Sequence, residues 1–587
     1  MKRLALVLVS FVILAVSLPK SGIAGERRIP LTEYADKVRA AWLGKMAGVG
    51  WGITTEFRYS HRLVPDSMMQ PWCVKRVNEG YNQDDLYLSL LSLELLRKYG
   101  PEVSARTACI ERQNLQFEYG GRNPLVFRDS IAPPDLGHPH YKPTSDGCGY
   151  TCGADFSGIV APGLPAAPVR FAASFGTDRC YGDGLYGGIF VGAMYCEAFF
   201  TADLRRIVEE ALRAIPERSL VACAVRDVMH WHRLYPDDWK RTWQLIMDKY
   251  WWNEENNWIA WPYGGVRKGI NLDSKSMAAM SVMALLYGEG DLHRTMRIAV
   301  QGSEDSDCNA SIAAGVLLAS RGMAVVDEEL LGALNRERRF KYFSRTFDGM
   351  VDLTLEVARR VIPFFGGRIE TRNGVEWIVI PGRGEDLRKT EYISSRNPGP
   401  LAQSRFSARE MAQLELLTDP GFENDDPAWS FFSDLRNNHI LPVERFGRIE
   451  GPVENRARTG FGNAVLGSWF RSGYPRANTR LFSGVRQTVR VEPGRTYRMS
   501  CFVRTEGEGF AGRGALRVVT LDGRVVASAT FGDKPEWTRV GVGVESGAEQ
   551  WLVVEIGFRG AENRRMMLRI DDCSFRMKSG KPGDPDR

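Results

Sequence analysis

Apolar residues from about residue 31 to residue 330 recur at the three- and four-residue spacing of amphipathic helices. Glycine and proline interrupt this pattern, and the alternating runs typical of strands are scarce. The stretches predicted to be helical are Leu86–Tyr99, Gly188–Phe200, Leu204–Ile215, Asp238–Trp251, Ser276–Tyr287 and Ala310–Arg321. This part of the chain is therefore expected to form an all-α bundle with long functional loops.

The pattern changes in the last third of the chain. Residues 365–383 predict a hairpin that turns at Asn373 and Gly374, and the polar residues 386–415 predict a linker. Short apolar runs then recur about ten residues apart, separated by turns, which is typical of an all-β sandwich. The expected strands are Val485–Val491, Thr496–Val503, Ala515–Leu521, Val525–Phe531, Thr538–Val544, Trp551–Phe558 and Met566–Ile570.

The first 24 residues have the composition of an export signal. Lys2 and Arg3 precede an apolar run from Leu4 to Leu18, and a small residue, Ala24, offers a cleavage site. The run is too short to span a bilayer comfortably, so we expect no stable membrane insertion after signal cleavage; an uncleaved anchor is the alternative. The predicted organisation is a signal peptide at 1–24, a helical domain at 25–385, a linker at 386–415, a β-sandwich at 416–577 and a disordered tail at 578–587.

Charge and cysteine content narrow the class of protein. The net charge of +6 over 587 residues, without a long basic run, gives no reason to expect a nucleic-acid partner. Ten cysteines fit the oxidising compartment of a secreted or periplasmic protein. Cys148 and Cys152 are close enough to form a disulfide if the turn permits, and Cys501 and Cys573 could join two strands. The chain has no CxxC motif, which argues against a zinc ribbon.

Three segments contain candidate chemistry. Gly44, Gly48 and Gly52 are spaced to lie on one side of a helix, where another backbone can approach closely, and Glu56 follows them. Tight helix packing with a surface glutamate explains the same spacing. The second segment, 82–85, places two aspartates at the start of the predicted helix Leu86–Tyr99. Helix capping and metal binding are both consistent with that position.

The third segment places alternating carboxylates before the predicted helix Ala310–Arg321. Glu304, Asp305 and Asp307 are the acidic residues, and they suggest the opening of an EF-hand loop. The sixth and twelfth positions of such a loop would be Ala310 and Val316, so an EF-hand is excluded. Two acidic clusters far apart in sequence could nevertheless meet around one hard cation.

Together these motifs resemble the ADP-ribosylglycohydrolase family over residues 34–330. The resemblance is carried by the glycine series that ends at Glu56, by the segment 83–85, and by the segment 305–310. Segments 153–156, 184–188 and 286–291 resemble a bacterial branch of the same family. The resemblance implies an all-α fold that holds two adjacent magnesium ions.

The resemblance also implies roles for individual residues. The implied metal ligands are Gln83, Asp84, Asp85, Asp305, Asp307 and Cys308. Glu56, Asp85 and Asp305 would be catalytic, and Asp155 and Tyr186 would bind substrate. The family usually has threonine where this chain has Gln83 and Cys308. Because a thiol is a poor ligand for magnesium, one metal site is expected to be weakened, lost, or filled by Mn²⁺ or another divalent ion.

The segment 416–423 and the pair Asp571 and Asp572 resemble parts of galactose-binding-like jelly rolls, including carbohydrate-binding modules. The predicted fold is thus an all-α ADP-ribosylglycohydrolase-like domain followed by an all-β jelly-roll sandwich. The predicted function is secreted, metal-dependent cleavage of a glycosidic bond at an anomeric carbon, in a glycan, a ribosyl-like glycoside or an ADP-ribosyl-type substrate. The alternative is a non-catalytic glycan-binding protein with a degenerate metal site.

Overall fold

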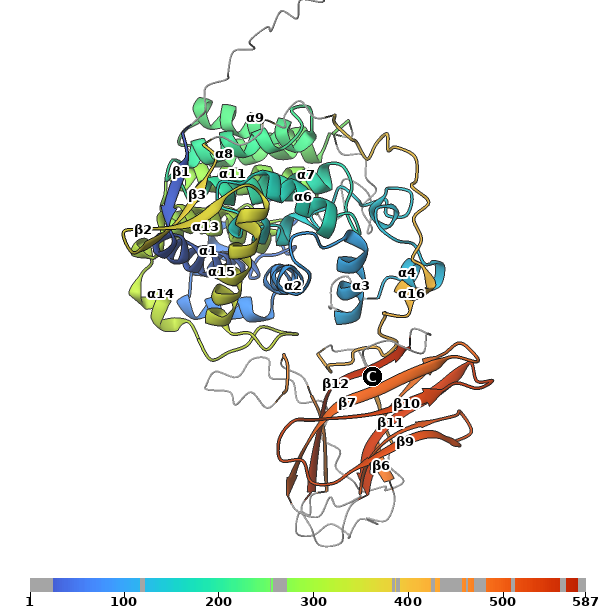
Figure 1. Ribbon diagram of the computed structural model, residues 1–587. Coiled ribbons are helices and arrows are strands. Elements are labelled where there is room, and N and C mark those ends of the chain that lie inside the picture. The colour runs from blue at the N-terminus through green and yellow to red at the C-terminus, as the bar shows by residue number, and fades with distance from the viewer. Residues whose placement is uncertain are drawn as a thin grey trace, which may run out of the picture.

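The molecule has a mainly helical part and a separate strand-rich part in this computed structural model (Figure 1). The predicted signal peptide and the predicted tail beyond residue 578 lie outside the described residues. No helix among the described residues has the length and apolar character needed to cross a membrane. The structure describes residues 25–116, 122–253, 255–256, 272–382, 386, 391–423, 428–432, 457–460, 463–468, 482–507, 513–559 and 566–578.

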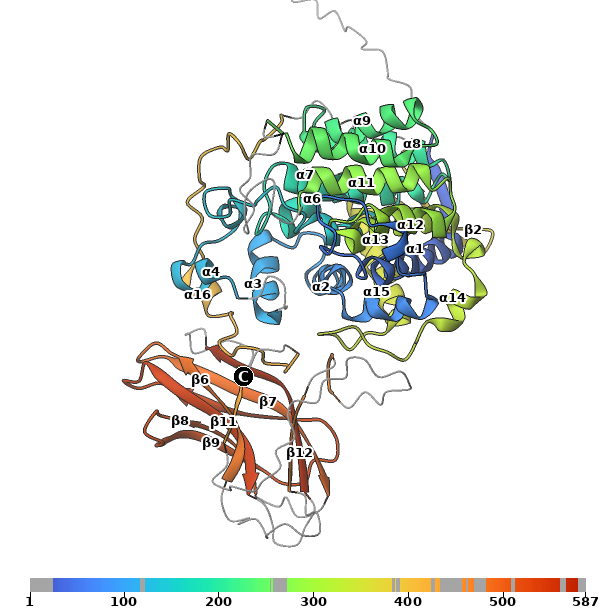
Figure 2. The ribbon, with the colours of Figure 1, turned by 180° about the vertical axis from the view of Figure 1, so that it is seen from behind.

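The first part is a helical domain, as the periodicity predicts. Its longer helices are α1 (Leu31–Gly52), α2 (Asp84–Tyr99), α3 (Ala105–Leu115), α6 (Ala166–Phe175), α7 (Asp183–Ala198), α9 (Leu220–Leu234), α11 (Ser274–Tyr287), α12 (Leu292–Gln301), α13 (Ser306–Arg321) and α15 (Phe347–Phe364). The shorter ones are α4 (Pro124–Asp129), α5 (Phe156–Ile159), α8 (Leu204–Ala211), α10 (Trp239–Ile246) and α14 (Glu328–Ala333). Helix α9 lies at the end of this domain that is farthest from the C-terminal strands (Figures 1 and 2).

Helices α1 and α13 pack backbone to backbone at the centre of the helical domain. The glycine series of α1 makes this approach possible, because a Cβ at Gly44 would lie 2.6 Å from the carbonyl oxygen of Ala314. A Cβ at Gly48 would lie 2.4 Å from the carbonyl oxygen of Ala310. These glycines therefore fix how closely the two helices approach each other.

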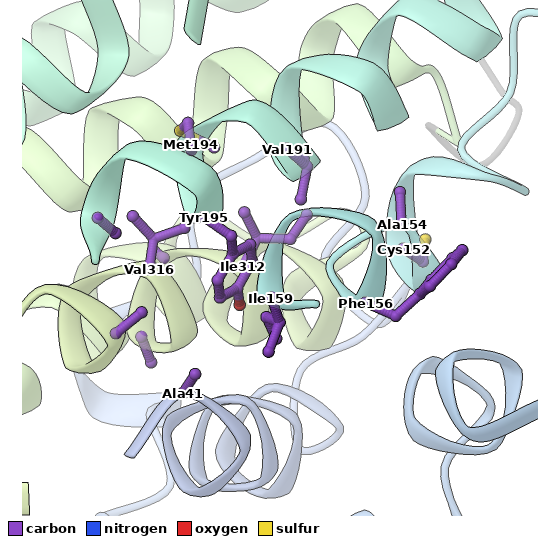
Figure 3. Packing of buried hydrophobic residues seen from close by; sticks show 14 of the residues in the cluster. Ala41, Cys152, Ala154, Phe156, Ile159, Val191, Met194, Tyr195, Ile312 and Val316 are labelled. Atoms are coloured by element: carbon purple, nitrogen blue, oxygen red, sulfur yellow. The ribbon is translucent and has the colours of Figure 1, made fainter. Parts of the chain in front are cut away.

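Helix α7 covers α13 on the side opposite α1. Val191, Met194 and Tyr195 of α7 lie over Ile312 and Val316 of α13 (Figure 3). All five side chains are buried in the core of the helical domain. Helix α13 thus has protein on both sides, which explains why its sequence is apolar and small-faced rather than amphipathic.

The predicted hairpin belongs to the helical domain. Strands β2 (Arg368–Arg372) and β3 (Val375–Ile380) form it, and β1 (Arg27–Pro30) pairs antiparallel with β3. The resulting sheet has the order β1-β3-β2. The sequence analysis did not predict β1, because a four-residue strand is too short to show a period.

The second part is a sandwich of two antiparallel sheets, which confirms the predicted β-sandwich. One sheet has the order β10-β7-β12-β5 and the other β4-β6-β11-β8-β9. Their inner faces share one hydrophobic core. The strands are β4 (Ser430–Phe432), β5 (Ala464–Ser468), β6 (Phe482–Arg490), β7 (Thr496–Gly507), β8 (Gly514–Val519), β9 (Val525–Phe531), β10 (Thr538–Glu545), β11 (Trp551–Arg559) and β12 (Met566–Met577).

Residues 391–415 connect the two parts and contact the helical domain closely. Tyr392 Oη donates a hydrogen bond to Asp183 at 2.5 Å, and the backbone amides of Ala402 and Ser404 donate to the carboxylate of Asp135 at 2.8 Å each. Helix α16 (Ala408–Met411) lies within this segment. The described part of the predicted linker, residues 391–415, therefore has specific partners on the helical domain.

Candidate metal centre

Three chain segments bring their carboxyl groups to one end of the α1–α13 pair. Glu56 lies in the turn that follows α1, Asp84 and Asp85 form the first turn of α2, and Asp305 and Asp307 lie at the start of α13. Each of these five groups influences the ionisation of at least one other. The structure thus brings together the acidic residues that the sequence places about 250 residues apart.

The loop before α13 is held in an uncommon backbone conformation. Ser303 and Glu304 have φ angles of 62° and 58°, in the left-handed region. The amide of Phe57 donates to the carbonyl oxygen of Glu304 at 3.0 Å, and the amide of His61 donates to the Glu304 carboxylate. These contacts join the turn after α1 to the loop before α13, which fixes Glu56 relative to Asp305 and Asp307.

Burial and mutual repulsion make the carboxyl groups hard to ionise. Burial and the nearby carboxylates of Asp84 and Asp85 raise the pKa of Glu56 to about 7. Burial and Asp85 raise the pKa of Asp84 to about 7. Burial is also the main reason why the pKa values of Asp305 and Asp307 lie well above the usual range. Without a compensating cation, the cluster therefore holds several protons at neutral pH.

The donor set fits a divalent cation. Hard cations take several carboxylate oxygens, and this cluster offers five carboxyl groups. Asp307 Oδ1 is buried and has no hydrogen-bond partner among the described residues. Against the effect of burial, the amino group of Lys45 lowers the pKa of Asp85, but it is already paired with Asp155 at 2.5 Å. Ionising several buried carboxyl groups this close together is costly, and a bound cation would remove that cost.

Three cysteine thiols lie directly against the buried carboxylates. The Cys308 thiol donates to Asp85 Oδ1 at 3.2 Å, and the Cys148 thiol donates to Asp305 Oδ2 at 3.4 Å. The Sγ atoms of Cys308 and Cys152 are 2.9 Å apart. Sequence analysis considered Cys148 and Cys152 as a disulfide of their own, but the fold brings a third thiol from α13 beside them.

All ten cysteines are free thiols in the structure. The disulfides considered between Cys148 and Cys152 and between Cys501 and Cys573 are therefore not formed. Each of these four side chains is buried. Cys501 and Cys573 lie in the sandwich core, where the apolar surroundings suit a neutral thiol.

Asp155 is buried and is held by contacts with Ser89 and Lys45. Its carboxylate accepts a hydrogen bond from Ser89 Oγ at 2.6 Å and pairs with Lys45, whose amino group also donates to the carbonyl oxygen of Cys152 at 2.8 Å. Asp155 and Lys45 are both about 1% exposed. Asp155 therefore supports the segment that bears Cys152, and its assignment to substrate binding stays a prediction.

Tyr186 lies on α7 next to a second buried ionic group. Its hydroxyl accepts a hydrogen bond from the amide of Ile393 at 3.1 Å. Nearby, burial and the carboxylate of Asp183 raise the pKa of Asp146 to about 7, burial raises the pKa of Asp183, and burial lowers the pKa of Lys275 to about 8. Tyr186 thus contacts the connecting segment, and its role in substrate binding stays a prediction.

Gln83 is the residue before α2, and its carbonyl oxygen accepts hydrogen bonds from the amides of Leu86 and Tyr87, both at 3.1 Å. Its side chain as a metal ligand stays a prediction. Sequence reasoning missed Lys45 and Ser311, whose hydroxyl donates to Asp85 Oδ2 at 2.9 Å. Lys45 could have been found from its position, because it lies within the glycine series of α1 that packs against another helix. A lysine buried at such a contact needs a partner of opposite charge.

Residues 30–360 match the family model described as ADP-ribosylglycohydrolase. No curated protein matches the chain. Among solved structures, an ADP-ribosylglycohydrolase-related protein complex is 17% identical with a TM-score of 0.36, covering 56% of this chain and 99% of that one. TmCBM61 in complex with β-1,4-galactotriose is 16% identical with a TM-score of 0.20, covering 28% of this chain and 99% of that one. A CBM4 structure is 12% identical, also with a TM-score of 0.20 and the same coverage.

The family model spans more than half of the chain and includes all five carboxyl groups of the cluster. The chain therefore belongs to the ADP-ribosylglycohydrolase family, a family of hydrolases that cleave glycosidic bonds.

Proposed function

We propose that this protein is an exported, divalent-metal-dependent hydrolase that cleaves a glycosidic bond in a glycan or a ribosyl-like glycoside. The single observation that supports it most is the meeting of Glu56, Asp84, Asp85, Asp305 and Asp307 at one end of the α1–α13 pair. Keeping several buried carboxyl groups together is costly unless a cation joins them. A relic that had lost its metal would have no functional reason to bear that cost.

The metal would be held by Asp84, Asp85, Asp305 and Asp307, with Mg²⁺ or Mn²⁺ as the proposed ion. When bound, a divalent ion supplies Lewis-acid chemistry and orients the hydroxyl groups of the sugar. The carboxylates hold it at the end of two packed helices, where their positions are fixed by the backbone. Gln83 and Cys308 are the proposed additional ligands.

Glu56 is proposed as the proton donor to the leaving group. Its pKa of about 7 leaves the side chain substantially protonated at neutral pH, and a carboxylic acid with a raised pKa is suited to general-acid catalysis. The base that receives a proton from the attacking water is proposed to be Asp305 or Asp85. Both oxygens of Asp85 already accept hydrogen bonds, from Cys308 and Ser311. Asp305 is therefore the better candidate of the two.

The β-sandwich is proposed to keep the enzyme on a carbohydrate. Trp551, at the start of β11, is 44% exposed, and its pairing partner on β6 is Arg490, which is also exposed. An exposed indole beside a charged side chain offers a flat apolar surface and a hydrogen-bond donor, the combination that a sugar ring needs. Trp551→Ala is expected to weaken retention on insoluble polysaccharide while soluble substrates are cleaved as before.

The test is to measure hydrolysis by residues 25–587 on ADP-ribosyl conjugates and on a library of activated glycosides, with Mg²⁺, Mn²⁺, Zn²⁺, Ca²⁺ or a chelator. We expect turnover on a glycoside that depends on the added ion and falls by at least about 100-fold in Glu56→Gln, the typical contribution of a general acid. Turnover only of ADP-ribosyl conjugates would correct the substrate class. No turnover with any ion on either class would favour the non-catalytic glycan-binding protein.

A further inference from the structure

We infer that Cys148, Cys152 and Cys308 form, together with Asp85 or Asp305, a buried site for one thiophilic divalent cation of the zinc type. This site goes beyond the proposed hydrolysis, whose metal is held chiefly by carboxyl groups with Cys308 only as an additional ligand. It shares two aspartates with the carboxylate cluster but takes its other donor atoms from sulfur.

The fold brings the three thiols together from two distant segments. Cys148 follows a bridge between Gly147 and Asp273, and its amide donates to the carbonyl oxygen of Leu272 at 2.7 Å. Cys152 lies one turn further on, in the short 3₁₀ helix η4 (Thr151–Gly153). Cys308 comes from the first turn of α13. All three side chains are buried, with no more than 8% of any residue exposed.

Most pairs of donor atoms are close enough to bind one ion, but Cys148 and Cys308 belong to no common group. The donor atoms form three overlapping groups, each with ligand atoms within 4.8 Å of one another: Asp85 with Cys152 and Cys308, Asp305 with Cys148 and Cys152, and Asp305 with Asp307 and Cys308. Tetrahedral zinc with bonds of about 2.3 Å to sulfur and 2.0 Å to oxygen places its ligand atoms roughly 3.5–3.8 Å apart.

The observed contacts lie close to that spacing. The Sγ–Oδ distances are 3.2 Å for Cys308 and Asp85 and 3.4 Å for Cys148 and Asp305. The Sγ atoms of Cys152 and Cys308, at 2.9 Å, would have to separate by somewhat less than about 1 Å. The Sγ atom of Cys148, which shares no group with Cys308, would have to approach it.

The chemistry of the cluster favours an ion over a disulfide. A disulfide uses two thiols and would leave the third buried beside an aspartate, whereas one cation can take all three. The sulfur atom of Met277 lies 3.8 Å from Cys152 Sγ, so the surroundings are rich in soft atoms. Thiolates select Zn²⁺ over Mg²⁺. Each thiol that binds the ion releases its proton to solvent, so binding of the ion should strengthen as the pH rises.

The test uses Co²⁺ as a spectroscopic substitute for Zn²⁺ on the reduced full-length chain in excess Mg²⁺. We expect one Co²⁺ per chain and a near-ultraviolet thiolate-to-cobalt charge-transfer band, both displaced by one equivalent of Zn²⁺. Cys148→Ser and Cys152→Ser should each lose at least half of the band intensity. Cys109→Ser and Cys196→Ser, which alter buried thiols outside these metal-ligand groups, should keep it.

Reduced wild-type protein without a charge-transfer band would overturn the inference, whether or not the serine variants fold. A band that survives in both Cys148→Ser and Cys152→Ser would overturn it too. The outcome is separate from that of the proposed function. Mg²⁺-dependent hydrolysis without the charge-transfer band would support the proposed function and refute the sulfur site. The band without hydrolysis would support the sulfur site and count against the proposed function.

Discussion

Gly52 faces Asp307 so closely that a Cβ at Gly52 would lie 2.2 Å from the Cα atom of Asp307. The last glycine of α1 therefore sets the position of a proposed metal ligand on α13. Gly52→Ala must push the two backbones apart, and we expect a loss of about 1–3 kcal/mol in the free energy of unfolding, the usual cost of overpacking. Weaker binding of a divalent ion should accompany it.

Chemical denaturation and calorimetric titration of the ion would measure these two effects. Gly332→Ala is the matched control, because a Cβ at Gly332, in α14, meets nothing within 4 Å. It should leave ion binding intact and be neutral or stabilising by up to about 1 kcal/mol. Equal stability of the two variants would show that α1 and α13 can separate without cost.

Asp305→Asn should remove most of the binding of a divalent ion. The substitution keeps the shape of the side chain but removes the charge that a hard cation requires. Even residues that only orient a metal ligand affect affinity by about 10–100-fold, so we expect at least this loss here. Elemental analysis and calorimetry would measure it, with the exposed Asp237→Asn as the control. Wild-type protein that binds no ion would refute the metal centre itself.

The stability of the metal-free protein should fall as the pH rises from about 5 to 7. Glu56 and Asp84 have pKa values of about 7 in the folded state, compared with about 4 in an unfolded chain. Between these values the folded state binds more protons than the unfolded state, so raising the pH favours unfolding. A divalent ion replaces the protons, and its stabilising effect should therefore be small at pH 5 and larger at pH 7.5.

Thermal melts with a chelator and with Mg²⁺, at several pH values in that range, would measure this linkage. Asp84→Asn should flatten the pH dependence of the chelated protein, whereas Asp237→Asn should not change it. A chelated protein that becomes more stable between pH 5 and 7 would contradict the proposed electrostatics of the cluster.

The β-sandwich should fold without the helical domain. It has its own hydrophobic core, and the amide of Leu416 donates to the carbonyl oxygen of Phe575 at 3.0 Å. The carboxylate of Glu415 accepts hydrogen bonds from the amide of Phe575 at 2.6 Å and from Ser574 Oγ at 2.7 Å. We expect residues 415–578 to form a soluble β protein by circular dichroism.

Fragment 416–577 lacks Glu415 and should melt at a lower temperature than fragment 415–578. The shorter fragment loses the hydrogen bonds that the Glu415 carboxylate accepts, and a hydrogen bond to a charged group contributes about 1.5–3 kcal/mol to the free energy of unfolding. If both fragments are insoluble alone and soluble only with the helical domain present, the two parts are one folding unit.

Export should remove the first residues of the chain. Lys2, Arg3 and the apolar run from Leu4 to Leu18 predict cleavage after Ala24. Mass spectrometry of protein recovered outside the cytoplasm should find Gly25 or a close neighbour at its N-terminus. An intact Met1 on that protein would contradict the prediction.

Periodicity alone was enough for the elements whose surroundings are uniform. The apolar run predicted as Leu86–Tyr99 is α2 from Asp84, and the alternation predicted as Val525–Phe531 is β9 with the same bounds. Helix α2 is buried on all sides from Asp85 to Leu93, and every position of β9 but the last is exposed or half-buried, so each element has one kind of surroundings along most of its length. Strand β1 was missed because four residues cannot show a period.

The composition of the carboxylate cluster could be read from the sequence, but its surroundings could not. Acidic residues at helix starts are consistent with capping as well as with metal binding, so Asp84, Asp85, Asp305 and Asp307 were visible only as candidates, and the resemblance added a role for Glu56. That Cys148 and Cys152 lie beside Cys308, and that Lys45 pairs with Asp155, depends on contacts between segments more than 100 residues apart. Local patterns contain no information about such contacts, because they arise only when α1, η4 and α13 pack together and their burial makes each unpaired polar group costly.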